Sequence, residues 1–119
     1  MRTLRWVMAV AAISLLIAAS LHAWLIIPGR FDQAAMYETA IAVILFIGLA
    51  LTLLGPGWAR WGGLVALVVA VGGASIGLYL ALRGLAPNTS LDIAYHVALV
   101  ALLLAGIVVA WRLPSTRTA

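Results

Sequence analysis

The sequence lacks cysteine and lysine altogether, and charged residues of either sign are scarce. Without cysteine there are no disulfides, iron–sulfur clusters, c-type haem attachment or cysteine-ligated zinc. Without lysine there is no Schiff base with retinal or pyridoxal phosphate, and no P-loop. Charged residues make up 8% of the 119 residues, whereas soluble domains carry about 25%. Because so few charges cannot solvate a globule, most of the surface must face lipid.

What the chain has in abundance is apolar sequence, with 66% hydrophobic residues and a mean hydropathy of +1.22. A helix needs about 20 apolar residues to cross a bilayer, and the chain contains four such stretches: 6–27, 34–54, 61–82 and 91–111. A proline follows each stretch, so the connections are short and neighbouring helices run antiparallel. The sequence therefore predicts an all-α integral membrane protein. We expect one domain over residues 1–119, an up-down-up-down bundle of four transmembrane helices.

The arginines predict which side of the membrane each end faces. With the N-terminus inside, five arginines fall on the cytoplasmic side, and two arginines with all three acids fall outside. This distribution obeys the positive-inside rule and predicts that both termini are cytoplasmic. The net charge of +4 does not indicate nucleic acid, because the arginines are scattered among apolar segments. Arginine without lysine, with much alanine and glycine, is typical of GC-rich bacteria and favours a bacterial inner membrane.

Small residues recur at helical spacing in two of the predicted spans. Gly73 and Gly77 form a small-xxx-small motif, and Ala11, Ser14 and Ala18 lie along one stripe of the first span. Small residues let helix backbones approach closely in lipid. These faces therefore predict helix packing, either inside the bundle, between two copies of the chain, or against a larger partner.

Four ionisable residues fall near the predicted outer ends of the spans. His22 lies late in the first span, Glu38 early in the second, and Asp92 and His96 early in the fourth. Asp92 and His96 are four residues apart and share a helix face. Ionisable side chains at membrane depth usually face the protein interior, so the sequence predicts a cluster of these residues.

Three functional interpretations of this cluster compete. His22 and His96 would ligate a b-type haem axially, or both histidines with Glu38 or Asp92 would hold a divalent metal such as Zn²⁺. A third interpretation is a proton or quinone relay through a histidine beside a carboxylate. A fourth needs no ligand: Asp92 completes a capping box that starts at Thr89, Glu38 lies in the first helical turn, and the histidines reach water or headgroups.

No Ser–His–acid arrangement is present, and three acids offer little material for hydrolysis. We therefore expect a protein that is not an enzyme. The leading hypothesis is an accessory or structural subunit that packs against partner membrane proteins or itself, as a homo-oligomer or within a larger complex. One alternative is a haem- or metal-binding redox protein that uses His22 and His96. The other is an oligomeric transporter of a small solute or ion.

Overall fold

The computed structural model describes residues 1–24 and 32–114, and within them all regular structure is helical. The elements are α1 (Arg2–Trp24), α2 (Asp32–Leu51), α3 (Pro56–Leu82) and α4 (Ser90–Trp111). Each of the four is long and apolar enough to span a membrane. This confirms the predicted all-helical class, and the four apolar helices indicate an integral membrane protein.

Three of the described helix boundaries differ from the predicted ones by three residues or more. Helix α1 begins at Arg2 instead of residue 6, and α2 ends at Leu51, three residues early. Helix α3 begins at Pro56, five residues early, so the proline that follows the second apolar stretch is also the first residue of the next helix. The physical reason is that proline fits the first helical position, where no amide donor is needed. The end of the first predicted span, residues 25–27, lies outside the described residues.

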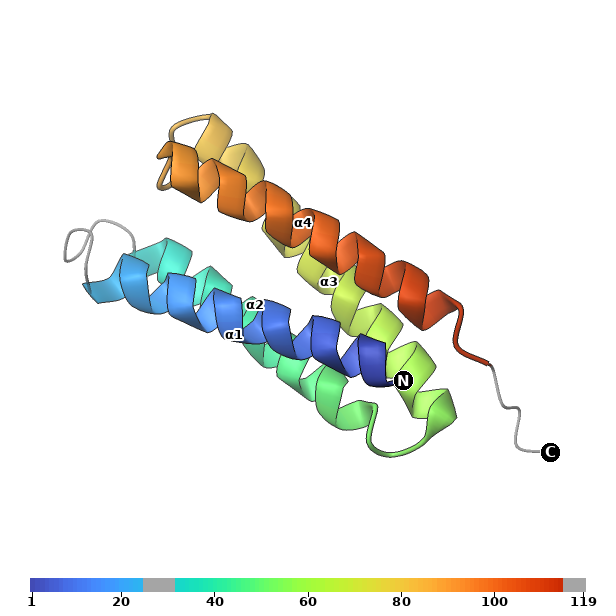
Figure 1. The fold of residues 1–119 in the computed structure, drawn as a ribbon. Coiled ribbons are helices and arrows are strands. Elements are labelled where there is room, and N and C mark those ends of the chain that lie inside the picture. The colour runs from blue at the N-terminus through green and yellow to red at the C-terminus, as the bar shows by residue number, and fades with distance from the viewer. Residues whose placement is uncertain (25–31, 115–119) are drawn as a thin grey trace.

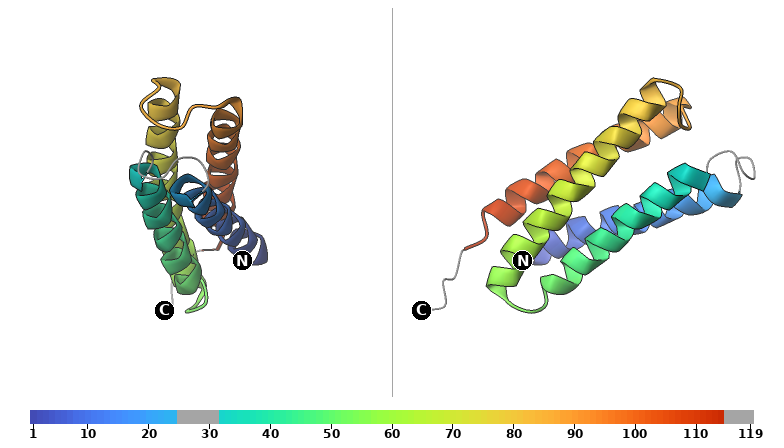
Figure 2. Two further views of the ribbon diagram at one scale, coloured as in Figure 1. Left: turned by 90° about the vertical axis from the view of Figure 1, so that its left-hand side faces the viewer. Right: turned by 180° about the vertical axis from the view of Figure 1, so that it is seen from behind.

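The four helices form two antiparallel hairpins, α1 with α2 and α3 with α4 (Figure 1). The hairpins pack together through α2 against α3 and through α1 against α4. They lie close together at the end where α1 begins and α4 ends, and they diverge toward the other end, as the view from behind also shows (Figure 2). The bundle is elongated, measuring 54 × 21 × 17 Å.

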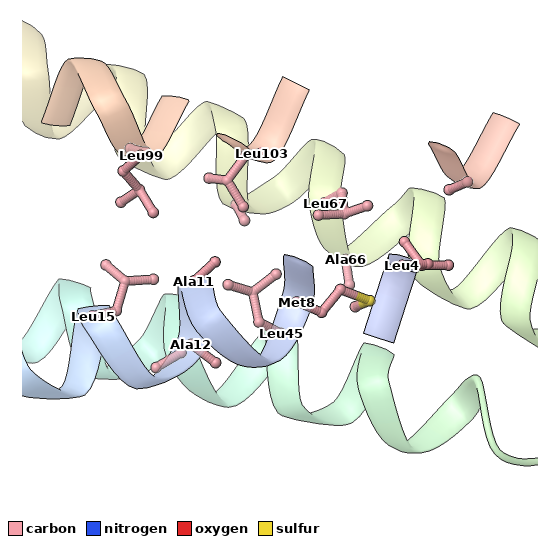
Figure 3. Packing of buried hydrophobic residues seen from close by; sticks show 14 of the residues in the cluster. Leu4, Met8, Ala11, Ala12, Leu15, Leu45, Ala66, Leu67, Leu99 and Leu103 are labelled. Atoms are coloured by element: carbon pink, nitrogen blue, oxygen red, sulfur yellow. The ribbon is translucent and has the colours of Figure 1, made fainter. Parts of the chain in front are cut away.

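The core of the bundle is built from leucine, methionine and alanine (Figure 3). Leu4 and Met8 of α1, Leu45 of α2, Leu67 of α3 and Leu103 of α4 are fully buried. Large apolar side chains also cover the outside of the helices, and the exposed fractions of Val65 and Ile76 exceed 60%. A surface of this kind requires lipid or another apolar partner around it.

Close packing at the converged end depends on small residues. A Cβ atom at Gly48 of α2 would overlap Ala66 of α3 and the end of Met8. A Cβ atom at Gly62 would lie 2.8 Å from the side chain of Leu51. The backbones of α2 and α3 therefore approach each other here more closely than larger residues would allow.

Two arginines join the helices at this same end. Arg5 of α1 donates from Nε to the hydroxyl of Thr52 (3.0 Å) and from Nη2 to its carbonyl oxygen (2.7 Å), just after α2 ends. The Arg60 guanidinium lies 5.7 Å from the ring centre of Trp61 and 5.4 Å from that of Trp111. These contacts tie α1 to α2 and α3 to α4 where arginine and tryptophan meet the expected membrane interface.

Candidate functional site

The divergent end of the bundle holds a buried cluster of ionisable residues. His22, in the last turn of α1, is 4% exposed, and Glu38 of α2 is 5% exposed. Glu38 is the seventh residue of its helix, which places it about 9 Å along the axis. It therefore lies beyond the first turn, and its position is not explained by the helix dipole as the ligand-free interpretation assumed.

The imidazole of His22 bridges carboxylates from two other helices. Its Nδ1 lies 2.8 Å from Oε2 of Glu38, and its Nε2 lies 3.3 Å from Oδ1 of Asp92 on α4. Helices α1, α2 and α4 thus meet through one ring. In the bilayer, where water does not compete, such contacts hold the hairpins in a fixed relation at the end where their backbones diverge.

Asp92 is oriented by the start of its own helix. The predicted capping box is confirmed: Thr89 donates from its backbone N to Oδ2 of Asp92 (3.0 Å), and the Asp92 amide donates to the Thr89 hydroxyl oxygen (3.2 Å). The Thr89 hydroxyl also donates to Oδ2. Capping and contact with His22 therefore coexist, since each uses a different oxygen of the same carboxylate.

His96 lies one turn further along α4. Its Nδ1 is 2.8 Å from the carbonyl oxygen of Asp92. Because a carbonyl only accepts, Nδ1 carries the hydrogen, and Nε2 of the neutral ring is left as an acceptor. The ring is seated against α3 at Gly77, where a Cβ atom would come within 2.9 Å of Nε2. Glycine at this position makes room for the imidazole.

The hydrogen bonds of the cluster fix its minimum number of protons. Each contact between His22 and a carboxylate needs one hydrogen, so the three groups His22, Glu38 and Asp92 share at least two. With two shared hydrogens, the net charge of these three side chains is −1. Oδ2 of Asp92 already accepts two hydrogen bonds from Thr89, so a third proton is accommodated best on Glu38. Protonation of Glu38 would make the cluster neutral.

A cavity of about 640 Å³ lies beside the cluster, between the two hairpins. His22, Glu38 and His96 line it, and its remaining wall is mostly apolar, including Ala74 and Leu80. This volume falls in the range of about 300–1,000 Å³ typical of sites for small molecules.

Part of the rim of the cavity is formed by α2 and α3. Tyr37 and Ile76 belong to its lining and are themselves 56% and 61% exposed. Leu85, which follows α3, also lines the cavity and is 73% exposed. The wall of the cavity therefore includes exposed residues at the depth of the cluster.

A second polar contact joins α1 and α4 next to the site. The hydroxyl groups of Ser14 and Tyr95 lie 3.1 Å apart, and Ser14 also donates to the carbonyl oxygen of Ala11 (2.9 Å). Ser14 therefore donates to its own helix, and Tyr95 supplies the hydrogen between the two hydroxyls. The Tyr95 ring also packs edge-on against His96, with 5.6 Å between ring centres.

The structure brings the four predicted site residues to one end of the bundle. There they contact one another. Both ring nitrogens of His22 face carboxylates, so ligation of haem iron would require breaking one of these contacts. Among the residues that the structure describes, no group of three histidine, aspartate or glutamate side chains is arranged to hold a metal ion. In this arrangement, both ring nitrogens of His22 are paired with carboxylates.

The predicted packing residues face the interior of the bundle. Ala11 is fully buried and Ala18 nearly so. A Cβ atom at Gly73 would lie 2.5 Å from Ile41 of α2, while Gly77 seats His96. Together with Ser14, these residues serve contacts within this chain, the first of the three packing alternatives.

Sequence reasoning missed Tyr95 and the seat at Gly77. The hydroxyl of Tyr95 lies 3.1 Å from that of Ser14 and joins α4 to α1. The available signal was its position next to His96 on the polar first turns of α4. The seat at Gly77 has no local signal, because it depends on the separation of α3 and α4.

No protein-family model matches the chain, and no curated protein and no solved structure matches it.

Proposed function

We propose that this chain is a membrane protein that binds a small organic solute inside the bilayer and links that binding to protonation of the His22–Glu38–Asp92 cluster. This is the chemistry of a proton-linked transporter, the third class expected from the sequence. The observation that carries the proposal is the position of a buried, protonatable cluster on the wall of a cavity of about 640 Å³.

Two physical arguments support this function. Ionisable groups at membrane depth are costly, and where they occur they usually lie on ion, proton or substrate pathways. The cavity also combines an apolar wall with a few converging polar groups, the usual composition of a site for small molecules. A purely structural role for the cluster would not require an accessible cavity beside it.

The test is binding of a matched set of naphthalene probes to the protein in nanodiscs of zwitterionic lipid. The set consists of 1-naphthylmethylamine, 1-naphthylmethanol and 1-naphthylacetate, measured by equilibrium dialysis against empty nanodiscs. We expect at least one probe to bind, and Ala34→Phe, which fills the cavity from α2, to abolish that binding. Ala50→Phe is the matched control, because Ala50 is an exposed residue at the opposite end of the same helix.

The proton link is tested with the same probes between about pH 5 and pH 8. Binding of at least one probe should change with pH in the wild type and become independent of pH in Glu38→Gln. If no probe binds in a manner that Ala34→Phe abolishes, the proposed function is wrong. Binding that is insensitive to pH in the wild type would refute the proton link alone.

The accessory-subunit role expected from the sequence stays a second candidate, and one observation favours it. Helix α4 exposes a row of four alanines at helical spacing, Ala94, Ala98, Ala101 and Ala105. This row would let a second helix approach closely in lipid. Energy transfer between differently labelled copies of the chain in proteoliposomes should then fall in Ala101→Leu and persist in Ala50→Leu. Equal transfer in both variants would remove this support.

A further inference from the structure

The site also specifies which kind of solute it would hold. Resting on the proposed function, we infer that the cavity takes an organic cation, an ammonium group with an apolar body. Its ammonium binds to the free oxygen of Glu38 in competition with a proton. The inference follows from the charge of the cluster, the hydrogen-bonding groups presented to the cavity, and the shape of the remaining wall.

The charge of the cluster is the first step. With the two hydrogens that its two contacts require, the set of His22, Glu38 and Asp92 has a net charge of −1. Among the described residues 1–24 and 32–114, none of those that line the cavity is an arginine. A buried negative charge without a nearby counter-charge is unfavourable in a medium of low dielectric constant, and a cation in the adjoining cavity would relieve it.

The second step concerns the groups that a solute would meet. Glu38 lines the cavity and contacts His22 through Oε2, while its Oε1 makes no hydrogen bond to any residue in the described ranges 1–24 and 32–114. His96 also lines the cavity, and in its neutral ring Nδ1 donates to the carbonyl oxygen of Asp92, which leaves Nε2 as an acceptor. Both groups accept hydrogen bonds. Of the other polar residues in the lining, Gln33 and Tyr37 can both donate and accept. A solute that donates two or more hydrogens, as an ammonium does, matches Glu38 and His96, whereas a carboxylate or a ketone has no hydrogen to donate to them.

The third step is the apolar remainder of the wall. Ile41 and Leu80 face the cavity from α2 and α3, and Tyr37 stands at its rim. An aromatic or aliphatic body attached to the ammonium would contact these side chains, and the Tyr37 ring would offer its face to the charge near the entrance. An inorganic cation would leave this surface unused.

The proton and the cation would therefore bind to the same oxygen, Oε1 of Glu38. Oδ2 of Asp92 accepts two hydrogen bonds from Thr89, and both ring nitrogens of His22 contact carboxylates. An additional proton is therefore accommodated best on Glu38. A cluster with that third proton is neutral and presents a hydroxyl donor in place of an acceptor. Binding of the cation at acid pH therefore releases this proton to water, and the two ligands exclude each other.

The titratable groups around Glu38 come from three helices. His22 lies on α1, Tyr37 on α2, and Asp92, Tyr95 and His96 on α4. From α3, the lining contributes only residues without a titratable side chain. The competition therefore depends on His22, Asp92 and His96 in addition to Glu38 itself, and the variants used to test it must separate their contributions.

The experiment compares the three naphthalene probes, which share one apolar body and differ in charge. In the wild type near neutral pH, we expect the amine to bind about tenfold or more tightly than the alcohol, because only the ammonium adds the attraction between opposite charges to its hydrogen bond with Glu38. The acetate should bind most weakly. On lowering the pH, affinity for the amine should fall while affinity for the alcohol stays constant.

Two variants test the contributions of the two hydrogen-bond acceptors, Glu38 and His96, separately. Glu38→Gln removes the charge and should equalise the amine and the alcohol. His96→Phe keeps a ring against Gly77 but removes the second acceptor, so the preference for the amine should shrink while its pH dependence remains. Elution as a single species and a wild-type far-ultraviolet spectrum establish that each variant is folded.

The outcomes distinguish this inference from the proposal on which it rests. If the alcohol or the acetate binds as tightly as the amine and Ala34→Phe abolishes that binding, the cavity is a solute site but the solute is not a cation. If no probe shows binding that depends on Ala34, both the inference and the proposed function fail. A preference for the amine that survives in Glu38→Gln would overturn the assignment of Glu38 as the acceptor.

Discussion

Nδ1 of His22 lies 2.8 Å from Oε2 of Glu38, and both residues are at least 95% buried. The two residues belong to α1 and α2, the helices of the first hairpin. Through the other nitrogen of the same ring, this hairpin reaches Asp92 on the second hairpin. One imidazole therefore connects both halves of the bundle at the end where their backbones diverge.

Removal of either His22 or Glu38 should destabilise the protein, and the two losses should not add. Each single change to alanine leaves the other partner buried without its main contact. We expect a coupling free energy of about 1–3 kcal/mol between His22→Ala and Glu38→Ala. The measurement is a double-mutant cycle on unfolding in dodecyl sulfate, followed by circular dichroism. Leu21→Ala, at an exposed neighbour of His22, should combine additively with Glu38→Ala.

The hydroxyl contact between Ser14 and Tyr95 should contribute as a single unit. Tyr95→Phe and Ser14→Ala each remove the 3.1 Å contact, and each should lower the free energy of unfolding by about 0.5–1.5 kcal/mol. The double variant should be little worse than either single one, because the same hydrogen bond is lost. Strictly additive losses in the same unfolding assay would show that the two hydroxyls act separately.

Gly77→Ala should displace His96 and destabilise the bundle. The new Cβ atom would lie 2.9 Å from Nε2 of His96, which forces the ring away from α3 at an expected cost of about 1–3 kcal/mol. Gly72→Ala is the matched control, since a Cβ atom there meets nothing within 4 Å. In a helix this change stabilises by up to about 1 kcal/mol. Equal effects at both positions would contradict the close seat of His96.

The orientation predicted from the arginines is open to a direct labelling experiment. The chain has no cysteine, so a single introduced cysteine reports one position. If both termini are cytoplasmic, a membrane-impermeant maleimide should label Asn88→Cys in intact bacterial cells. It should label Thr3→Cys only after the cells are permeabilised. The reverse pattern would invert the topology and place the cluster near the cytoplasmic side.

The composition and the apolar stretches were sufficient to predict four membrane-length helices, because the length of an apolar run and the scarcity of charge depend only on local sequence. The capping box from Thr89 to Asp92 was also predictable, since all its groups lie within one turn. The start of α3 at Pro56 was mispredicted because the boundary was drawn from hydropathy. A proline at the first helical position extends the helix without any apolar signal.

The pairing of particular side chains was decided by the tertiary structure alone. The sequence placed His22, Glu38, Asp92 and His96 at one depth, but it did not specify that His22 would face two carboxylates and His96 a backbone carbonyl. Those contacts depend on how each helix is rotated about its axis and on the angle between the two hairpins. These are set by packing of small residues such as Gly48 against Ala66. The cavity has the same origin: the hairpins converge where glycine and alanine meet and diverge where the polar cluster lies, and a linear sequence does not encode that separation locally.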